Sequence, residues 1–280
     1  MTSVPAYLNG EYQPLEDCRV SVLDRGFIFG DGIYELITVY NNQAFYLEQH
    51  LQRLERSISE IKVPSPYDKS EWLALINNLI QQAEDDDLAI YIQVTRGIAP
   101  RDHVFPKSTQ ATVFAMANPL PKVPSKHLKN GVELVTSEDI RWQRCDIKVI
   151  SLLANILAKQ EAAEADAVEA VLIRDGFALE GSASNLFVVR DGVVYTHPKD
   201  NLILPGITRD FVLELLQELN ITCKQQAIPK DWLYSADELW ITSSTKEVLA
   251  ATKIDQKIVG DGKPGELWRK THALYQQRKM

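Results

Sequence analysis

Two Asp-Gly dipeptides, Asp175-Gly176 and Asp191-Gly192, place the strongest constraint on the fold of the second half of the chain. Each separates two short runs that are rich in valine, leucine, isoleucine and aromatic residues. An Asp-Gly pair between such runs favours a two-residue β-hairpin turn, because both central residues of that turn need a positive φ. We therefore predict antiparallel strands on both sides of each dipeptide, and a further hairpin at Asn9-Gly10.

A proline-rich stretch divides the 280-residue chain into two parts. Three prolines lie within residues 118–125, and proline resists both helices and central strands. We predict a small domain of helices and strands at residues 1–118, a linker at 119–125 and a larger, β-rich domain at 126–280.

Composition and charge exclude several classes of protein. A net charge of −8 disfavours a nucleic-acid-binding or anionic membrane-binding surface. No apolar run approaches the roughly 18 residues of a membrane span, and the first residues lack the features of a signal peptide. The three cysteines have no metal-type spacing and are expected to be free thiols. We expect a cytoplasmic protein that binds no metal, nucleic acid or membrane.

Lys148 precedes a segment with helical spacing, in which Leu153, Ile156 and Leu157 recur. An amine beside an apolar surface loses solvent, and desolvation lowers the pKa of an amine. A neutral amine is a nucleophile that can form a Schiff base. From position alone, however, a solvated lysine at a helix entrance is the commoner interpretation.

The first half contains two more candidate site residues. Arg53 lies in an amphipathic helix predicted from the spacing of apolar residues between Leu47 and Ile61. Tyr34 follows the glycines of a GDG turn and opens a predicted strand. Taken alone, Arg53 is equally consistent with a surface ion pair, and Tyr34 with a core or interface position.

Three motifs of the second half carry the parts that hold a phosphorylated cofactor. EGSASN begins with Glu180, whose carboxylate could serve a pyridinium nitrogen. LPGITRD begins at Leu204 and predicts a helix whose first N–H groups, at Ile207 and Thr208, could bind a phosphate, although an ordinary helix start is the commoner interpretation of this motif alone. ITSSTKE adds the hydroxyls of Ser243 and Ser244.

In this order, the lysine and the three motifs resemble the fold-type IV enzymes that depend on pyridoxal 5'-phosphate, over nearly the whole chain. The resemblance implies an α+β fold, with a small α/β domain and a larger pseudo-barrel domain that binds the cofactor. It implies that Lys148 forms the Schiff base and that Glu180 pairs with the pyridine nitrogen. It assigns the other cofactor contacts to Arg53, Leu204, Ile207, Thr208, Ser243 and Ser244.

The loop PRDHVFP decides the subfamily. Arg101 and His103 are two residues apart and would point to the same side of an extended chain. An arginine binds a carboxylate through two hydrogen bonds, although an R-x-H in a solvated loop is common by chance. In the D-amino-acid aminotransferases, which this loop resembles, the pair and the tyrosine matching Tyr34 bind the substrate carboxylate across a homodimer interface. The resemblance implies D-amino acid and 2-keto acid substrates.

Alternative functions remain on the same scaffold. They are an aminodeoxychorismate lyase, an R-selective amine transaminase and a branched-chain L-amino-acid aminotransferase. A non-catalytic module that binds a phosphorylated ligand is the alternative from another class. It would require the separate cofactor contacts to be coincidental, and it predicts a colourless protein.

Overall fold

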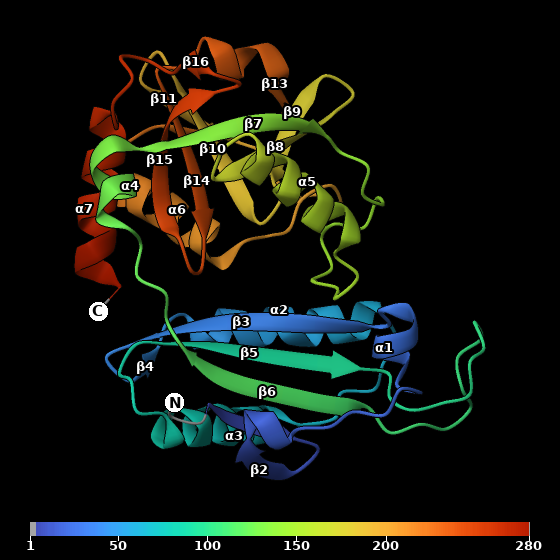
Figure 1. Cartoon of the computed structure of the whole chain (residues 1–280). Helices are drawn as coiled ribbons and strands as arrows, with labels where there is room; N and C mark the ends of the chain where they lie inside the picture. Colours follow the sequence, from blue (N-terminus) through green and yellow to red (C-terminus); the bar gives the residue numbers. More distant parts are fainter. Residues whose placement is uncertain (1–3, 280) are drawn as a thin grey trace. The chain divides into compact units, whose positions relative to one another are not determined.

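The computed structural model describes residues 4–279, which form two compact units. Unit 1 comprises the chain up to Pro121 together with Ile147–Ser151, and unit 2 comprises Lys122–Asp146 together with the chain from Leu152 onward (Figure 1). The boundary predicted from the prolines had placed Ile147–Ser151 with the second domain. The structure groups this segment, and Lys148 with it, with unit 1.

Unit 1 is built on an antiparallel sheet with the strand order β2-β1-β6-β5-β3-β4. The strands are β1 (Pro5–Leu8), β2 (Glu11–Pro14), β3 (Gly32–Tyr40), β4 (Gln43–Ala44), β5 (Leu88–Thr95) and β6 (Thr112–Pro119). Asn9 and Gly10 join β1 to β2 with φ values of 50° and 105°. Both positive φ values agree with the hairpin expected from the Asn-Gly pair.

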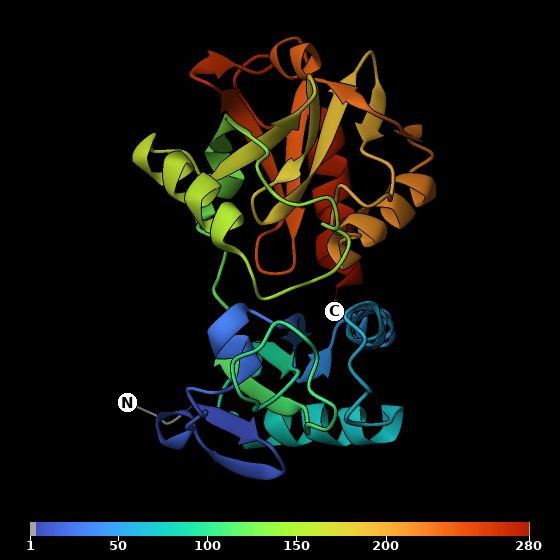
Figure 2. The ribbon, with the colours of Figure 1, turned by 90° about the vertical axis from the view of Figure 1, so that its right-hand side faces the viewer.

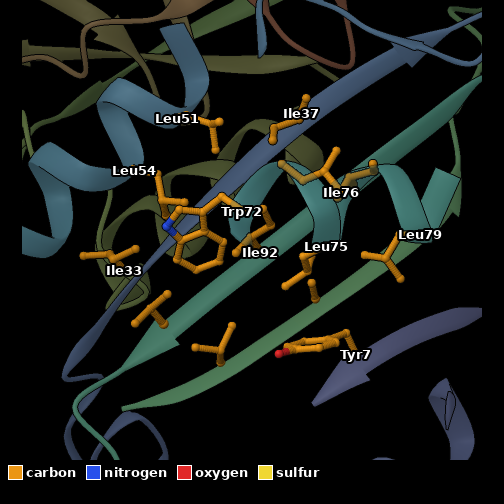
Figure 3. Close-up of a cluster of buried hydrophobic side chains, with 14 of the residues drawn as sticks. Tyr7, Ile33, Ile37, Leu51, Leu54, Trp72, Leu75, Ile76, Leu79 and Ile92 are labelled. Atoms are coloured by element: carbon orange, nitrogen blue, oxygen red, sulfur yellow. The ribbon is translucent and has the colours of Figure 1, made fainter. Parts of the chain in front are cut away.

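Two long helices cover one face of this sheet. Unit 1 contains η1 (Leu15–Asp17), α1 (Arg25–Phe29), α2 (Leu47–Glu60) and α3 (Lys69–Gln82). Figure 2 shows α2 and α3 on the same side of the strands. Their buried apolar side chains form one cluster with those of the strands, and Trp72 lies within it with no exposed surface (Figure 3). Removing so large a buried side chain typically costs about 3–5 kcal/mol, so this cluster stabilises the sheet that carries the candidate residue Tyr34.

The segment Ile147–Ser151 completes the edge of β3. Ile33 and Val149 form an antiparallel bridge, and the N–H of Ile150 donates to the carbonyl oxygen of Gly32 at 3.1 Å. The strand β4 pairs with the opposite end of β3, at Val39 and Tyr40. The edge of β3 is therefore paired at both ends, which protects backbone groups that would otherwise be open to other chains.

Unit 2 is a mixed sheet that closes on itself. Its strands are β7 (Val132–Glu138), β8 (Glu169–Arg174), β9 (Phe177–Gly181), β10 (Ser184–Arg190), β11 (Val193–Thr196), β12 (Cys223–Gln225), β13 (Ile228–Pro229), β14 (Glu238–Ser243), β15 (Glu247–Ile254) and β16 (Lys257–Ile258). Pairing between β9 and β10 closes the path β10-β14-β15-β7-β8-β9 into a barrel. Both predicted Asp-Gly turns have positive φ at each residue, at Asp175-Gly176 and Asp191-Gly192.

Helices surround the barrel. They are α4 (Ser125–Asn130), α5 (Leu153–Glu164), α6 (Ile207–Glu218), η2 (Lys230–Tyr234) and α7 (Glu266–Arg278). The helix α5 packs on β7 and β8 (Figure 1) through Ala158 and Ala162, which are buried, whereas Leu153, Ile156 and Leu157 are exposed. Within residues 4–279, no helix combines the length and apolar character needed to cross a membrane.

Candidate active site

Hydrogen bonds fix the backbone of Lys148, and its side chain faces an aromatic ring. Its carbonyl oxygen accepts a hydrogen bond from the N–H of Tyr34 at 2.9 Å, and its N–H donates to Ser57 Oγ at 3.4 Å. Its Nζ lies 4.2 Å from the centroid of the Tyr34 ring, which stacks in turn on Tyr91. A cation over an aromatic face is attracted by the ring quadrupole. The lysine head and the Tyr34 ring therefore form one unit of the site.

Arg53 forms a buried ion pair with Glu35. Its Nε donates to Glu35 Oε2 at 2.9 Å and its Nη2 to Oε1 at 2.6 Å, while His50 Nδ1 lies 3.0 Å from the same Oε1. Burial opposes ionisation of Glu35, but Arg53 and His50 outweigh it and hold the pKa of this carboxyl well below its usual range. Burial lowers the pKa of His50, which favours a neutral imidazole. The guanidinium that was expected to bind a phosphate is thus fixed in orientation by β3.

Arg101 and His103 lie against the same aromatic side chain. The guanidinium carbon of Arg101 is 5.2 Å from the centroid of the Phe29 ring, and the ring of His103 is 5.4 Å from it. Both residues are exposed in the loop between β5 and β6. The structure therefore brings the two members of the R-x-H pattern together on Phe29, at the end of α1.

Glu180 is buried in unit 2 and accepts hydrogen bonds from three groups. Arg141 Nη1 donates to Oε1 at 2.6 Å, Asn185 Nδ2 donates to Oε2 at 3.0 Å, and the N–H of Leu204 is 3.1 Å from each oxygen. Burial outweighs these donors and raises the pKa of Glu180 to about 7. A carboxyl in this state gains from a further positive partner, which a protonated pyridine nitrogen would supply.

Asn185 connects Glu180 to the start of α6. Its Nδ2 also donates to the carbonyl oxygen of Leu204 at 2.9 Å, two residues before the N-cap Gly206. A Cβ built on Gly206 would lie 2.0 Å from Asn185 Oδ1, so a larger residue here would displace the Asn185 side chain that contacts Glu180. The acid and the helix N-terminus are therefore fixed relative to each other.

The N-terminus of α6 and the turn after β14 supply donors for an anion. Within residues 4–279, α6 has no side-chain cap at Gly206, so its first N–H groups could bind an anion beside the buried Thr208. Ser243 and Ser244 are half-buried, and the buried hydroxyl of Thr242 has no hydrogen-bond partner among residues 4–279. This donor set, with a buried acid that lacks sufficient positive charge, fits the phosphate and the pyridine nitrogen of pyridoxal phosphate.

The structure assigns the predicted residues to two groups. Unit 1 holds Tyr34, Arg53, Arg101, His103 and Lys148. Unit 2 holds Glu180, Leu204, Ile207, Thr208, Ser243 and Ser244. In the part of the chain that the structure describes, no group of three or more His, Cys, Asp or Glu residues could hold a metal ion.

Sequence reasoning missed four residues that fix the predicted ones. Glu35 and His50 hold Arg53, and Arg141 and Asn185 hold Glu180. Two local signals were available, because His50 lies one helical turn before Arg53 and Asn185 stands within the EGSASN motif. Glu35 and Arg141 reach their partners from distant parts of the chain, and no local pattern indicates such contacts.

Sequence comparison identifies relatives across nearly the full length. The family model "Amino-transferase class IV" matches residues 32–254. D-Alanine aminotransferase of Bacillus licheniformis is 42% identical over 268 residues, covering 96% of this chain and 94% of the relative. D-Alanine aminotransferase of Staphylococcus aureus (strain COL) is 43% identical over 272 residues, covering 97% of this chain and 96% of the relative.

Structure comparison finds the same fold. Branched-chain amino acid aminotransferase from Escherichia coli superposes with a TM-score of 0.93 at 24% identity, covering 100% of this chain and 95% of that one. The T.th. branched-chain amino acid aminotransferase complexed with N-(5'-phosphopyridoxyl)-L-glutamate has a TM-score of 0.90 at 27% identity, covering 99% and 94%. The predicted fold class, a small α/β unit with a larger pseudo-barrel, is confirmed. The chain belongs to the class IV aminotransferases, the fold-type IV enzymes that use pyridoxal phosphate.

Proposed function

We propose that this chain transfers amino groups from D-amino acids to 2-keto acids with pyridoxal phosphate as cofactor. One observation carries the proposal: the chain is 42–43% identical, over almost its whole length, to D-alanine aminotransferases. The candidate site also contains an amine at Lys148, a buried acid at Glu180 and an arginine at Arg101, which are groups that this reaction requires. D-Alanine is the expected donor, with 2-oxoglutarate as the expected acceptor.

Lys148 is the proposed catalytic residue. Pyridoxal phosphate, when bound, supplies an aldehyde that condenses with amines and a ring that takes up electrons as the Cα–H bond breaks. The Nζ of Lys148 would hold the cofactor and, once released, accept the proton from the substrate Cα and return it as an acid. Two contacts, from the N–H of Tyr34 and to Ser57 Oγ, support this role because they hold the backbone from which the amine extends.

The other proposed cofactor contacts are an acid for the pyridine nitrogen and a set of hydrogen-bond donors for the phosphate. Glu180 would pair with the pyridine nitrogen, and burial makes it favour a positive partner. The N–H groups of Ile207 and Thr208 and the hydroxyls of Ser243 and Ser244 would hold the phosphate. We assign Arg53 to the same phosphate, with Leu204 contributing through the backbone that connects Glu180 to α6.

Arg101 and His103 are proposed to bind the substrate carboxylate together with Tyr34. The common contact with Phe29 holds the two side chains on one side of the loop. A guanidinium and an imidazole N–H offer a carboxylate several donors, which fixes the direction of the Cα–H bond. Selection of the D-isomer would follow from that direction.

A second copy of the chain is the proposed partner. Val22, Phe27 and Val104 of unit 1 are apolar side chains that are 68%, 70% and 73% exposed. A homodimer would cover these side chains, and light scattering on the purified protein tests it. We propose a cytoplasmic location, which is consistent with free thiols at Cys18, Cys145 and Cys223.

The test is the visible absorption of the purified protein with each isomer of alanine. We expect D-alanine to convert the bound cofactor to its aminated form, with one equivalent of pyruvate released, and L-alanine to leave the spectrum unchanged. A protein that binds no pyridoxal phosphate, or a spectrum that responds to L-alanine alone, would contradict the proposal.

A branched-chain L-amino-acid aminotransferase is the second candidate, because enzymes named as branched-chain aminotransferases share this fold at TM-scores of 0.93 and 0.90. Their identity of 24–27% is well below that of the D-alanine aminotransferases. Conversion of the cofactor by L-leucine would favour this candidate. Conversion by an amine without a carboxylate would favour an R-selective amine transaminase, and release of pyruvate from aminodeoxychorismate would favour a lyase.

A further inference from the structure

A buried glutamate in the barrel collects hydrogen bonds from two separate turns. Glu169 begins β8 and has no exposed surface. Ser182 Oγ donates to its Oε1, while Ser184 Oγ and Lys246 Nζ each donate to its Oε2 at 3.1 Å. A buried carboxylate is stable only when such partners compensate for its lost hydration. Glu169 is therefore the point at which these turns are joined.

The two turns are those assigned to opposite ends of the cofactor. Ser182 and Ser184 lie in the EGSASN segment, directly after Glu180. Lys246 lies in the turn between β14 and β15, and its backbone N–H donates to Ser243 Oγ at 3.3 Å. Lys246 thus holds the Ser243 hydroxyl through its backbone and the buried carboxylate through its side chain.

The opposite charges of Glu169 and Lys246 favour a fixed contact between the two side chains. Burial acts to raise the pKa of Glu169, but Lys246 and the Ser182 hydroxyl outweigh it and lower the pKa, so the carboxylate is ionised. The Lys246 side chain is 27% exposed and loses part of its freedom in making this contact. The turn ends at Glu247 with a φ of 56°, a conformation that a non-glycine residue adopts only when its surroundings hold it.

A second lysine offers a natural comparison. Lys159 Nζ is 3.7 Å from Glu169 Oε1, and its side chain is 41% exposed. It extends from α5 and donates to the carbonyl oxygen of Val168. Lys159 therefore shares the charge of Glu169 but is anchored at α5 and the start of β8, whereas Lys246 belongs to the turn that carries Ser243. A comparison of variants at the two lysines can therefore distinguish the effect of positive charge near Glu169 from the effect of holding the Ser243 turn in place.

We propose that Lys246 is a positioning residue that joins the Ser243–Ser244 turn to the Glu180 segment through Glu169, and thereby sets the affinity for pyridoxal phosphate. The inference rests on the proposed function, because it takes these two segments as the phosphate and pyridine contacts. Lys246 itself touches neither the cofactor nor the substrate in this proposal. Its effect reaches the cofactor through the placement of Ser243 and Ser244.

The experiment compares Lys246→Met, Lys246→Arg and Lys159→Met. The dissociation constant of pyridoxal phosphate is measured by equilibrium dialysis against the apoenzyme, and melting temperatures are measured with and without cofactor. Because misplacement of the turn would weaken a phosphate hydrogen bond from Ser243 or Ser244, we expect about tenfold weaker binding in Lys246→Met. Lys246→Arg restores most of the affinity, because it keeps the charge and the donors. Lys159→Met binds the cofactor like the wild type.

Lys246→Met leaves the Glu169 carboxylate without its closest cation, which could prevent folding. The double variant Glu169→Gln/Lys246→Met removes both charges and keeps a side-chain amide for Ser182 and Ser184. We expect it to fold, to bind pyridoxal phosphate as weakly as Lys246→Met, and to recover turnover when the cofactor is saturating. Its melting temperature should rise less on addition of cofactor than that of the wild type.

Three results would overturn the inference. If Lys159→Met and Lys246→Met lost the same affinity for pyridoxal phosphate, Lys246 would act only through its positive charge and would not position the turn. A lower melting temperature of the apoenzyme with an unchanged dissociation constant would make it a purely structural residue. Wild-type affinity in the double variant would show that the junction does not position the turn. A wild-type protein that does not bind pyridoxal phosphate would instead reject the proposed function.

Discussion

The backbone N–H of Tyr34 donates to the carbonyl oxygen of Lys148 at 2.9 Å, and the Lys148 Nζ returns to lie 4.2 Å from the centroid of the Tyr34 ring. The two residues are thus joined twice, once through the backbone and once through the side chains. The backbone contact fixes the origin of the lysine side chain, and the ring contact gives its amine a preferred position. Precise placement of a reacting group is a large part of enzymatic rate enhancement.

Replacing Lys148 with alanine should abolish transamination. Loss of proton transfer alone lowers rates by about 10²–10⁴-fold, and the variant also loses its covalent attachment to the cofactor. Pyruvate formation from D-alanine and 2-oxoglutarate measures the loss. Partial recovery with added methylamine would separate a catalytic from a structural defect, and Lys126→Ala at an exposed position serves as control. Turnover near the wild-type value would reject the assignment.

Replacing Arg101 with alanine should raise KM for D-alanine far more than it lowers kcat. A lost charge-assisted hydrogen bond is worth about 1.5–3 kcal/mol, which corresponds to roughly tenfold to 100-fold in KM. Steady-state kinetics of Arg101→Ala and His103→Gln give the comparison, with Lys107→Ala as a control in the same exposed loop. An unchanged KM in both site variants is the outcome that would remove the loop from the substrate site.

Glu180 should make the apoprotein less stable as the pH rises. Burial raises its pKa from 4.5 to about 7, so between these values the folded state binds more protons than the unfolded state. The free energy of unfolding therefore falls with pH in this window, by roughly 3 kcal/mol at most. Urea denaturation at pH 5 and pH 8 measures the change.

The Glu180→Gln variant should lose this pH dependence, since an amide does not titrate. Glu11→Gln at an exposed position of β2 controls for the loss of one carboxyl group. The same slope in Glu180→Gln and the wild type would show that other groups cause the pH dependence.

Replacing Glu35 with alanine should destabilise the protein by about 3–5 kcal/mol, because it leaves the buried Arg53 guanidinium without its counter-charge. The comparison is Lys69→Met, which breaks the exposed pair between Lys69 and Glu48 and should cost about 1 kcal/mol or less. Denaturation in urea measures both. A similar small loss in the two variants would mean that Arg53 finds another partner when Glu35 is absent.

Local chemistry made part of this structure predictable. The Asp-Gly and Asn-Gly turns were placed correctly, because few residues other than glycine, asparagine and aspartate adopt positive φ readily. The helix around Arg53 followed from apolar spacing, and α2 spans Leu47–Glu60. Periodicity also identified α5, but it gave no indication that Leu153, Ile156 and Leu157 would be exposed. Spacing shows which residues share a face and cannot show what covers that face.

Pairing between distant segments was not predictable. Val149 bridges Ile33, and Glu35 pairs with Arg53, yet neither contact leaves a pattern within a few residues of either partner. The proline-rich segment predicted a linker at residues 119–125, and nothing in the sequence indicated that Ile147–Ser151 would belong to unit 1. Such contacts depend on how the whole unit packs, and a short stretch of sequence does not contain that information.

The contribution of Ile147–Ser151 to the edge of β3 has a consequence for biosynthesis. A nascent chain that has been synthesised only to Pro121 contains the helices and strands described for unit 1 but lacks this late segment. The N–H of Tyr34 and the carbonyl oxygen of Gly32 then lack their contacts with Lys148 and Ile150. Unit 1 can reach its final form only after a further 30 residues, through Ser151, have been synthesised. Expression of a fragment that ends at Pro121 would leave an open strand edge, which promotes aggregation. The segment that carries Lys148, the proposed catalytic residue, is also the segment that completes the sheet edge beside it.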